Sequence, residues 1–268
     1  MRFQSLASLG LALQPTSKTS MTLDYWRIER RAEINIKSAA ELLAIEGSAL
    51  PAGNAILRRP LDGGDQSFSL AEQAQYGVTV GSLSAIERSF ENLFKTKTSG
   101  IDLGFELSES LPIGNLKVNG LGTYLISYRG FVGADNRYGD NLAGRYGRPR
   151  VNATLDVALT TGVWRNVITL RHSSGYTLAG DYNDSVGNAA WCAERAWADP
   201  CFVGASTTVD YGVRWAGSKG LTLSVHVQNL GNKFMPIDFR AQQRGSVAPN
   251  EPDDAKRRTW RLKAEYAF

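Results

Sequence analysis

The sequence predicts an all-β protein, a portion of an antiparallel up-and-down transmembrane β-barrel with about nine strands. Three observations lead to this prediction. Apolar and polar residues alternate with a period of two along much of the chain, as in strands with one apolar face. The connections alternate between short and long, as in outer-membrane barrels. Glycine (27 residues) and aromatic residues (10%) are frequent, which suits a protein with many turns.

The predicted strands follow one another from the start of the chain. Ala7, Leu9, Leu11 and Leu13 alternate with small or polar residues, although Arg2 before this apolar stretch also suggests a signal peptide. Interrupting serines and the lack of a clear cleavage site favour the strand. The same alternation fills the other predicted strands: 20–28, 101–108, 116–128, 151–160, 164–171, 209–215, 221–228 and 257–268.

The connections fall into two classes. The short ones carry Pro, Gly, Asn or Ser, which suit tight turns: 15–18, 112–115, 161–163 and 217–220. The long ones are predicted to be extracellular loops, and the short ones periplasmic turns: about 31–84, 131–145, 179–206 and 235–257. A soluble sandwich gives no reason for this regular alternation. In the first long loop, Ser38 and Glu41 have capping-box spacing, which predicts a short helix.

Each predicted strand has two different faces. Aromatic residues lie towards the ends of the apolar face, and we expect them to form a girdle at the lipid interface: Tyr25, Tyr128, Trp164, Trp215 and Trp260. Lipid does not satisfy open strand edges, so such a sheet is expected to belong to a closed barrel. The charged residues of the other face are candidates for a lumen wall: Asp156, Arg165, Arg171, Asp210, Arg214, His226, Arg261, Lys263 and Glu265.

Several function classes find no support in the sequence. It has no run of 18 apolar residues, and its net charge of +4 comes without a nucleic-acid-binding signature. It also lacks the phosphate-loop, HExxH and CxxC motifs. His172 and Ser173 suggest a hydrolase, but neighbours on a strand point to opposite faces. We therefore predict no catalytic residue, metal or cofactor, and no enzyme activity.

Four stretches, in order along the chain, carry a resemblance. They are "TLDYWRIERRAEI" (22–34), "FENLFKTKTSGIDLGFEL" (90–107), "HVQNLGNKFMP" (226–236) and "RRTWRLKAEYAF" (257–268). Each is weak alone, but together they resemble the C-terminal part of a TonB-dependent outer-membrane receptor over essentially the whole chain. The third resembles the Asn-Leu-x-Asn-Lys-aromatic signature of the penultimate strand, and the fourth resembles the closing strand.

The resemblance implies active uptake of a scarce nutrient, such as a siderophore–iron complex, cobalamin or an oligosaccharide. It places the protein in the outer membrane of a Gram-negative cell, with the C-terminus in the periplasm. Tyr266 and Phe268 would signal to the barrel-assembly machinery. The other implied partners are outer-membrane lipid, a small-molecule ligand at the outer loops, and the TonB complex through a plug part. No nucleic acid is implied.

The sequence departs from the family in one main respect. Large transporters have 22 strands around a plugged lumen, whereas about nine strands are predicted here, without a plug or a TonB box. We therefore expect the C-terminal part of a larger receptor. A self-contained small outer-membrane barrel with an adhesin or enzyme role is the alternative, and a soluble sandwich that binds ligands is a third.

Two cysteines lie in the predicted loop 179–206. Cys192 and Cys201 are close enough in sequence for a local disulfide, which a loop in an oxidising compartment would favour; unpaired thiols are the alternative. Trp191, Trp197 and Phe202 flank them, either to stack on a ligand or to pack the loop onto itself.

Overall fold

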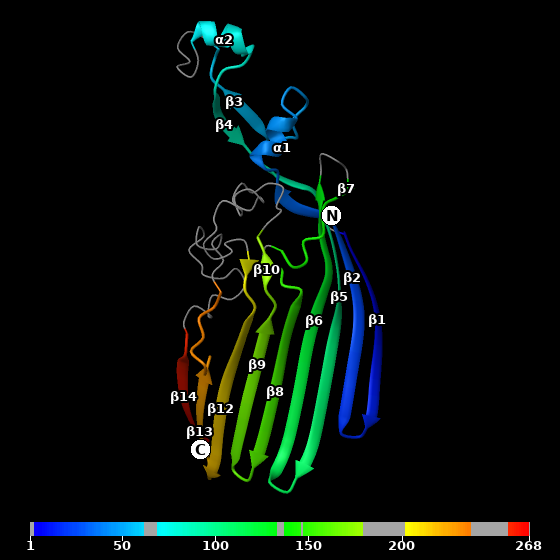
Figure 1. The fold of residues 1–268 in the computed structure, drawn as a ribbon, viewed down its shortest axis with the longest axis vertical. Helices are drawn as coiled ribbons and strands as arrows, with labels where there is room; N and C mark the ends of the chain where they lie inside the picture. The colour runs from blue at the N-terminus through cyan, green and yellow to red at the C-terminus, as the bar shows by residue number, and fades with distance from the viewer. Residues whose placement is uncertain are drawn as a thin grey trace. The chain divides into compact units, whose positions relative to one another are not determined.

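A computed structural model describes residues 3–61, 69–132, 137–145, 147–178, 202–236 and 257–267. Nine strands form one antiparallel sheet in which each strand pairs with its neighbours in this series (Figure 1). They are β1 (Phe3–Thr16), β2 (Thr19–Ile36), β5 (Phe90–Leu111), β6 (Gly114–Val132), β8 (Val151–Thr161), β9 (Trp164–Ser173), β12 (Ser206–Ser218), β13 (Leu221–Gln228) and β14 (Thr259–Tyr266). This confirms the predicted nine-stranded, up-and-down sheet. Within the described residues, β1 and β14 are its two edges.

The chain divides into two compact units. The first, here called the sheet unit, comprises Leu6–Ile28, Lys97–Arg129 and Asp140–Phe268. The second, the loop unit, comprises Met1–Ser5, Glu29–Thr96 and Gly130–Gly139.

Tight turns join the strands of the sheet unit at one end, here called the turn end; the other is the long-loop end. The turn between β8 and β9 contains Gly162 with a φ of 55°, a left-handed conformation that suits glycine. Ten successive residue pairs then link β8 to β9, from Thr161↔Trp164 to Asn152↔Ser173, without a register shift. A tight turn thus fixes which residues face one another along both strands.

The loop unit contains more strands and helices than the sequence indicated. Strand β2 takes up the first residues of the predicted loop 31–84, and β5 begins well before the predicted strand 101–108. Helix α1 (Ala39–Ala44) confirms the predicted helix: the Ser38 side chain accepts a hydrogen bond from the Glu41 backbone N–H, and the Glu41 side chain accepts from that of Ser38. The sequence pattern did not indicate the hairpin of β3 (Ala55–Arg58) and β4 (Leu83–Glu87), or helix α2 (Leu70–Tyr76).

A polar cluster joins distant residues within the loop unit. Lys37, just after β2, lies 3.1 Å from a carboxylate oxygen of Glu91 in β5, and both side chains are largely buried. Asn54 donates hydrogen bonds to Glu91 (3.0 Å), to the Ser89 hydroxyl (3.1 Å) and to the Pro51 carbonyl oxygen (3.1 Å). These contacts bring together the two ends of a long chain segment.

Three short strands lie in the other connections. Strand β7 (Arg137–Tyr138) pairs with the end of β6. Strand β10 (Tyr176–Thr177) pairs with β11 (Phe202–Val203), and Tyr176, Leu178 and Val203 form a small buried cluster. Among the described residues, no helix is both long and apolar enough to cross a membrane.

Candidate functional site

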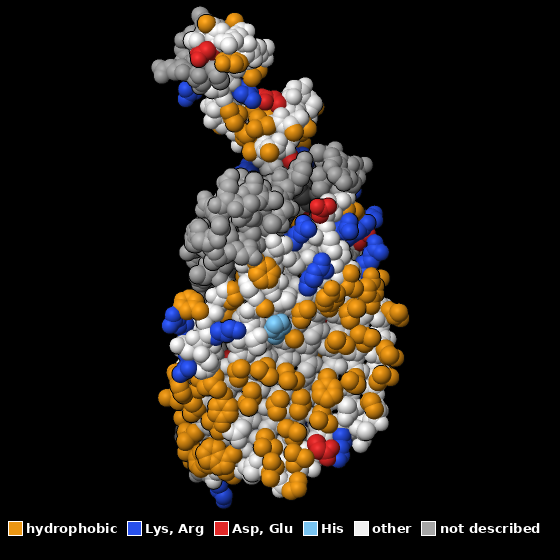
Figure 2. Space-filling model, in the orientation of Figure 1, with side chains coloured by type: hydrophobic (Ala, Val, Ile, Leu, Met, Phe, Trp, Pro, Cys, Tyr) orange, Lys and Arg blue, Asp and Glu red, His pale blue; other side chains and the backbone are white. Residues whose placement is uncertain are grey.

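One face of the sheet, here called the apolar face, exposes large hydrophobic side chains. Figure 2 shows hydrophobic side chains gathered over the strands, with Lys and Arg side chains along their border. Leu103 is 57% exposed and Leu262 is 76% exposed, although both belong to paired strands. So many exposed apolar side chains on one surface indicate a partner or a lipid environment rather than water.

The predicted girdle residues lie on the apolar face of their strands. Trp164 and Trp215 lie directly opposite each other at the turn end, with ring centroids 6.4 Å apart. Trp260 is paired with Val227 and is 64% exposed. Tyr25 is 41% exposed, and Tyr128 lies under the guanidinium of Arg148, 4.3 Å from the ring centroid. That these aromatic residues form a girdle at the lipid interface stays a prediction.

The opposite face, here called the polar face, carries all nine candidate wall residues. The pairing Asp156↔Thr169↔Asp210 crosses three strands, and residues paired in this way lie on one face. The other candidate wall residues take part in pairs that lie on this same face: Arg165↔Arg214, Arg214↔Ser224, Ser224↔Lys263, His226↔Arg261, Thr222↔Glu265 and Thr208↔Arg171. The structure therefore brings these nine residues together on one surface.

An ion pair with a buried carboxylate lies on the polar face, towards its long-loop end. The Arg171 guanidinium donates to the Asp210 carboxylate, whose side chain is 2% exposed, whereas that of Arg171 is 43% exposed. The other Asp210 oxygen accepts the Asn229 backbone N–H at 2.8 Å. A carboxylate this buried needs such partners, because an unpaired buried charge is strongly destabilising.

Other charges on this face are arranged differently. Lys263 lies 2.6 Å from Glu265, and both side chains are more than half exposed. Arg165 and Arg214 face each other directly across β9 and β12. Like charges in this position repel, and the Glu265 carboxylate lies close enough to Arg214 to offset part of this repulsion.

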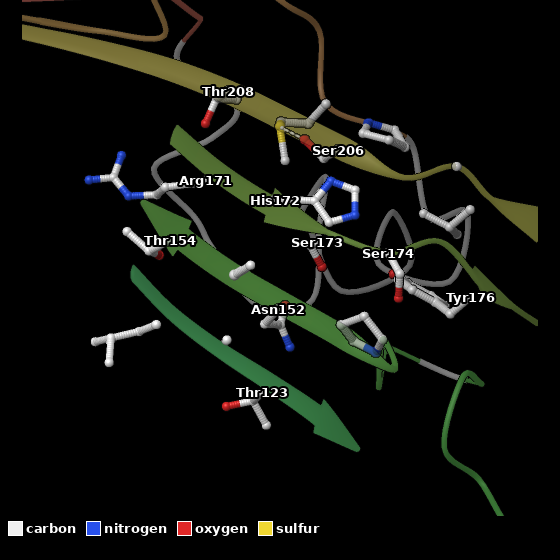
Figure 3. A pocket seen from close by; sticks show the side chains of 18 residues that line it. Thr123, Asn152, Thr154, Arg171, His172, Ser173, Ser174, Tyr176, Ser206 and Thr208 are labelled. Atoms are coloured by element: carbon white, nitrogen blue, oxygen red, sulfur yellow. Dashed lines mark hydrogen bonds between the residues drawn. The ribbon is translucent and has the colours of Figure 1, made fainter. Parts of the chain in front are cut away.

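A cavity of about 320 Å³ opens on the polar face at the long-loop end. Arg171 and His172 line it together with hydroxyl and amide side chains: Thr123, Asn152, Thr154, Ser173, Ser174, Ser206 and Thr208. Leu121, Tyr176, Val203 and Met235 contribute apolar surface. In Figure 3 the Arg171 guanidinium points away from the hydroxyls of Ser173 and Ser206. The cavity thus offers hydroxyl and amide groups and one arginine beside apolar patches, a combination that suits a small polar ligand.

His172 and Ser173 fall on opposite faces, as the strand pattern predicted. His172 Nδ1 lies 2.8 Å from the Thr207 hydroxyl, and neighbouring Ser173 pairs with Asn152 on the polar face. Among the described residues, no group of three or more His, Cys, Asp or Glu could hold a metal ion.

The asparagine-rich stretch after β13 has a structural role that sequence reasoning missed. Asn229 (φ 53°) and Asn232 (φ 51°) both adopt the left-handed conformation, which asparagine tolerates better than most residues. The Asn229 side chain accepts the Lys233 backbone N–H and donates to the Lys233 carbonyl oxygen. Its own backbone N–H holds Asp210. The Asn-Leu-x-Asn-Lys stretch therefore forms a turn and also donates a hydrogen bond to the buried carboxylate of the ion pair.

Several predicted residues lie outside the described part of the chain. They are Cys192, Cys201, Trp191, Trp197 and Phe268. The proposed disulfide and the terminal aromatic thus stay predictions. Phe202 is 52% exposed in β11, and Tyr266 is 60% exposed at the turn end of β14, opposite Leu221.

Comparison with known proteins gives one family match. Residues 7–230 match the model of the family described as TonB dependent receptor-like, beta-barrel. No curated protein matches the sequence.

Solved structures with the same fold come from several bacteria. The outer membrane transporter YddB of Escherichia coli matches with a TM-score of 0.57 and 13% identity. The siderophore receptor PirA of Acinetobacter baumannii gives 0.57 and 13%, and the FrpB iron transporter of Neisseria meningitidis gives 0.56 and 15%. Each match covers 100% of this chain but only 33%, 32% and 31% of those chains, respectively. The chain therefore spans about a third of the length of these structures, and at such identities the likeness concerns the fold.

Proposed function

Because the chain belongs to the TonB-dependent receptor-like β-barrel family, we propose that it forms part of the barrel wall of an outer-membrane receptor that takes up a scarce nutrient. The observation that carries this proposal is the contrast between the two faces of one sheet. The apolar face suits lipid, and the polar face, with its paired charges and cavity, suits a water-filled lumen. The family places the protein in the outer membrane of a Gram-negative cell.

In this proposal the ligand approaches from the long-loop end. There the cavity holds it through the hydroxyls of residues such as Thr154 and Ser206. PirA is named a siderophore receptor and FrpB an iron transporter, so a siderophore–iron complex is one candidate; cobalamin and oligosaccharides are others. Transport requires no bond-making step, so the chain is proposed to act as a receptor and not as an enzyme.

The rest of the polar face is proposed to contact the plug part of the whole receptor. Arg165 and Arg214, paired across two strands, would meet acidic groups of that part. Coupling to the TonB complex would run through the plug and not through these strands.

Assembly and orientation complete the proposal. Strand β14 with Tyr266, and the terminal residue Phe268, would be recognised by the barrel-assembly machinery, and the C-terminus would lie in the periplasm. The long connections would then be extracellular, where oxidation would join Cys192 to Cys201.

The first test is an immunoblot of outer membranes from the native organism, with an antibody against residues 240–256. We expect a band several times heavier than the 29.2 kDa of this chain (about threefold by the length ratio). A band of 29 kDa in the membrane would instead support a self-contained small barrel. Recovery from the aqueous fraction without detergent would contradict both.

The second test blocks the cavity. Thr154→Trp fills the cavity, whereas Thr160→Trp lies on the same strand and face near the turn and does not line it. Cells carrying each variant receive radiolabelled ferric chelates, radiolabelled cobalamin or a fluorescent maltodextrin. We expect Thr154→Trp to reduce uptake of one probe at least tenfold, and Thr160→Trp to leave it unchanged. Equal uptake of every probe by both variants would refute the role given to the cavity.

A further inference from the structure

Met235 supplies the one sulfur atom among the described residues that line the cavity. The Ser206 hydroxyl donates a hydrogen bond to this sulfur at 3.1 Å, which Figure 3 shows as a dashed line. Ser206 is only 8% exposed, and Met235 is less buried. The sulfur therefore meets the cavity on one side and a buried hydroxyl on another.

Two separate parts of the chain hold the hydroxyl and the sulfur in place. Ser206 is the first residue of β12 and is paired there with β9. Met235 follows the turn in which the Asn229 side chain binds both backbone groups of Lys233. Because both backbones are anchored, the hydroxyl is expected to cover the same side of the sulfur at all times.

This arrangement bears on the oxidation chemistry of the thioether. A thioether sulfur carries two lone pairs, and either can attack hydrogen peroxide. The attack forms an S–O bond and breaks the O–O bond; the sulfur is oxidised by two electrons, and the other peroxide oxygen leaves as water with both peroxide protons. The product is methionine sulfoxide, which is polar and chiral at sulfur. The lone pair that reacts decides which of the two epimers forms.

We propose that Met235 is an oxidation site, at which peroxide entering the cavity converts the thioether mainly to one sulfoxide epimer. The Ser206 hydroxyl covers one lone pair, so the reaction takes place at the lone pair on the cavity side. The new oxygen then enters the apolar part of the lining, near residues such as Leu121 and Val203. Oxidation thereby lowers uptake, and this consequence alone rests on the proposed function.

The chemical test uses the full receptor in vesicles, treated with dilute hydrogen peroxide and then digested. The peptides are incubated with each of the two classes of methionine sulfoxide reductase, which reduce opposite epimers, and mass spectrometry measures the Met235 sulfoxide that remains. We expect roughly a fivefold excess of one epimer, since reaction at the covered lone pair breaks a hydrogen bond.

Two hydroxyl deletions on β12 separate the effect of the contact from that of the cavity. Ser206→Ala uncovers the second lone pair and should bring the two epimers to near-equal amounts. Thr208→Ala removes a hydroxyl from the same strand and the same cavity but keeps the hydrogen bond to sulfur, so the excess of one epimer should remain.

The functional test uses cells that carry the wild-type receptor, Met235→Leu or Met235→Gln, with the radiolabelled ferric chelate, radiolabelled cobalamin and fluorescent maltodextrin probes. Peroxide should reduce wild-type uptake of the transported probe about fivefold or more, because a polar oxygen in the lining is left without a partner. Met235→Leu has no sulfur and should keep its own untreated rate. Met235→Gln places a polar group at the same position and should lower uptake without peroxide.

Two results of the chemical test would overturn the inference. One is a lack of sulfoxide at Met235 under conditions that oxidise free methionine, and the other is equal amounts of both epimers in the folded wild type. Wild-type uptake that survives complete oxidation of Met235 would refute the effect on the cavity. If untreated cells take up none of the probes, the proposed function fails instead, and the epimer ratio still decides whether Met235 is the oxidation site.

Discussion

The assignment of one face to lipid can be tested with two leucines on neighbouring strands. Leu103 on β5 belongs to the apolar face and is 57% exposed, whereas Leu121 on β6 belongs to the polar face and is 69% exposed. A Cβ on Gly104, which neighbours Leu103, would lie 4.0 Å from the Leu121 side chain and 2.4 Å from the Thr22 hydroxyl. The two leucines are therefore at similar heights on opposite faces, and Leu→Arg at each compares the two environments.

The expected cost follows from the depth of Leu103. The apolar residues of β5 run from Ile101 to Leu107, and Ser99 and Glu109 continue the same face on either side. Leu103 thus lies near the middle of the apolar stretch, where an arginine facing lipid costs about 2–4 kcal/mol. This corresponds to a fall of roughly thirtyfold to a thousandfold in the ratio of folded to unfolded protein. Leu121→Arg should cost at most about 0.5 kcal/mol, because its guanidinium stays hydrated.

The assay is a urea titration of the protein in phospholipid vesicles, followed by tryptophan fluorescence and by heat-modified mobility on gels. The free energy of unfolding is extrapolated linearly to zero urea, and the variants are compared only if its slope against urea concentration is the same for each. Equal costs at both positions would refute a lipid-facing apolar face. A larger cost at Leu121 would mean that the two faces are assigned the wrong way round.

Three other changes test the ion pair, a close strand contact and a helix cap. Arg171→Leu leaves the buried Asp210 carboxylate without its cation, so denaturant titration should show a loss of about 3–5 kcal/mol; Asp210→Asn should cost less, because the remaining guanidinium is 43% exposed. Gly100→Ala would place a methyl group 2.5 Å from the Trp26 indole, and we expect a loss of about 1–3 kcal/mol in the same titration. Hydrogen bonds from the N-cap serine lower the pKa of Glu72 below its ordinary value of 4.5, so the cap stabilises α2 fully above pH 4.5 and is lost as the pH falls through the lowered value. Limited proteolysis of residues 69–77 should show this pH dependence, and Glu72→Gln should remove it.

Matched variants show which outcomes would contradict these expectations. Arg165→Leu removes an arginine from the same strand and face, opposite Arg214, and should be neutral or stabilising; a cost equal to that of Arg171→Leu would refute the ion-pair argument. Gly130→Ala has nothing within 4 Å of its new methyl group and should be harmless. A protease sensitivity of Glu72→Gln that still rises as the pH falls would rule out the cap as its cause.

The sequence predicts the strands of this sheet well because its two faces meet different surroundings. In β8 each apolar residue from Val151 to Leu159 alternates with a residue of the polar face, and the register keeps that alternation from end to end. The capping box of α1 was predictable for a similar reason, since Ser38 and Glu41 satisfy local backbone groups. Local rules suffice where the interactions are local.

The sequence is less informative where interactions are distant or the alternation breaks. Strand β2 continues to Ile36 through a charged stretch in which Ala32 has a φ of 54°, so parity no longer indicates a strand there. Leu121 is apolar but lies on the polar face, where it lines the cavity. The contact of Asp210 with Asn229 joins β12 to the stretch after β13, and no spacing rule reveals it. The cavity itself depends on such tertiary contacts.

The polar cluster of Lys37, Asn54, Ser89 and Glu91 bears on how the sheet is built during folding. Four of the eight pairs of neighbouring strands are joined by tight turns, so their pairing requires little loop closure. Strands β2 and β5 have the longest connection, because more than fifty residues separate Ile36 from Phe90. A loop of this length raises the entropic cost of closure slowly, by about 0.6 kcal/mol for each doubling. Once the cluster has formed, β2 and β5 meet as if joined by a short connection, and the length of the intervening segment no longer affects the sheet.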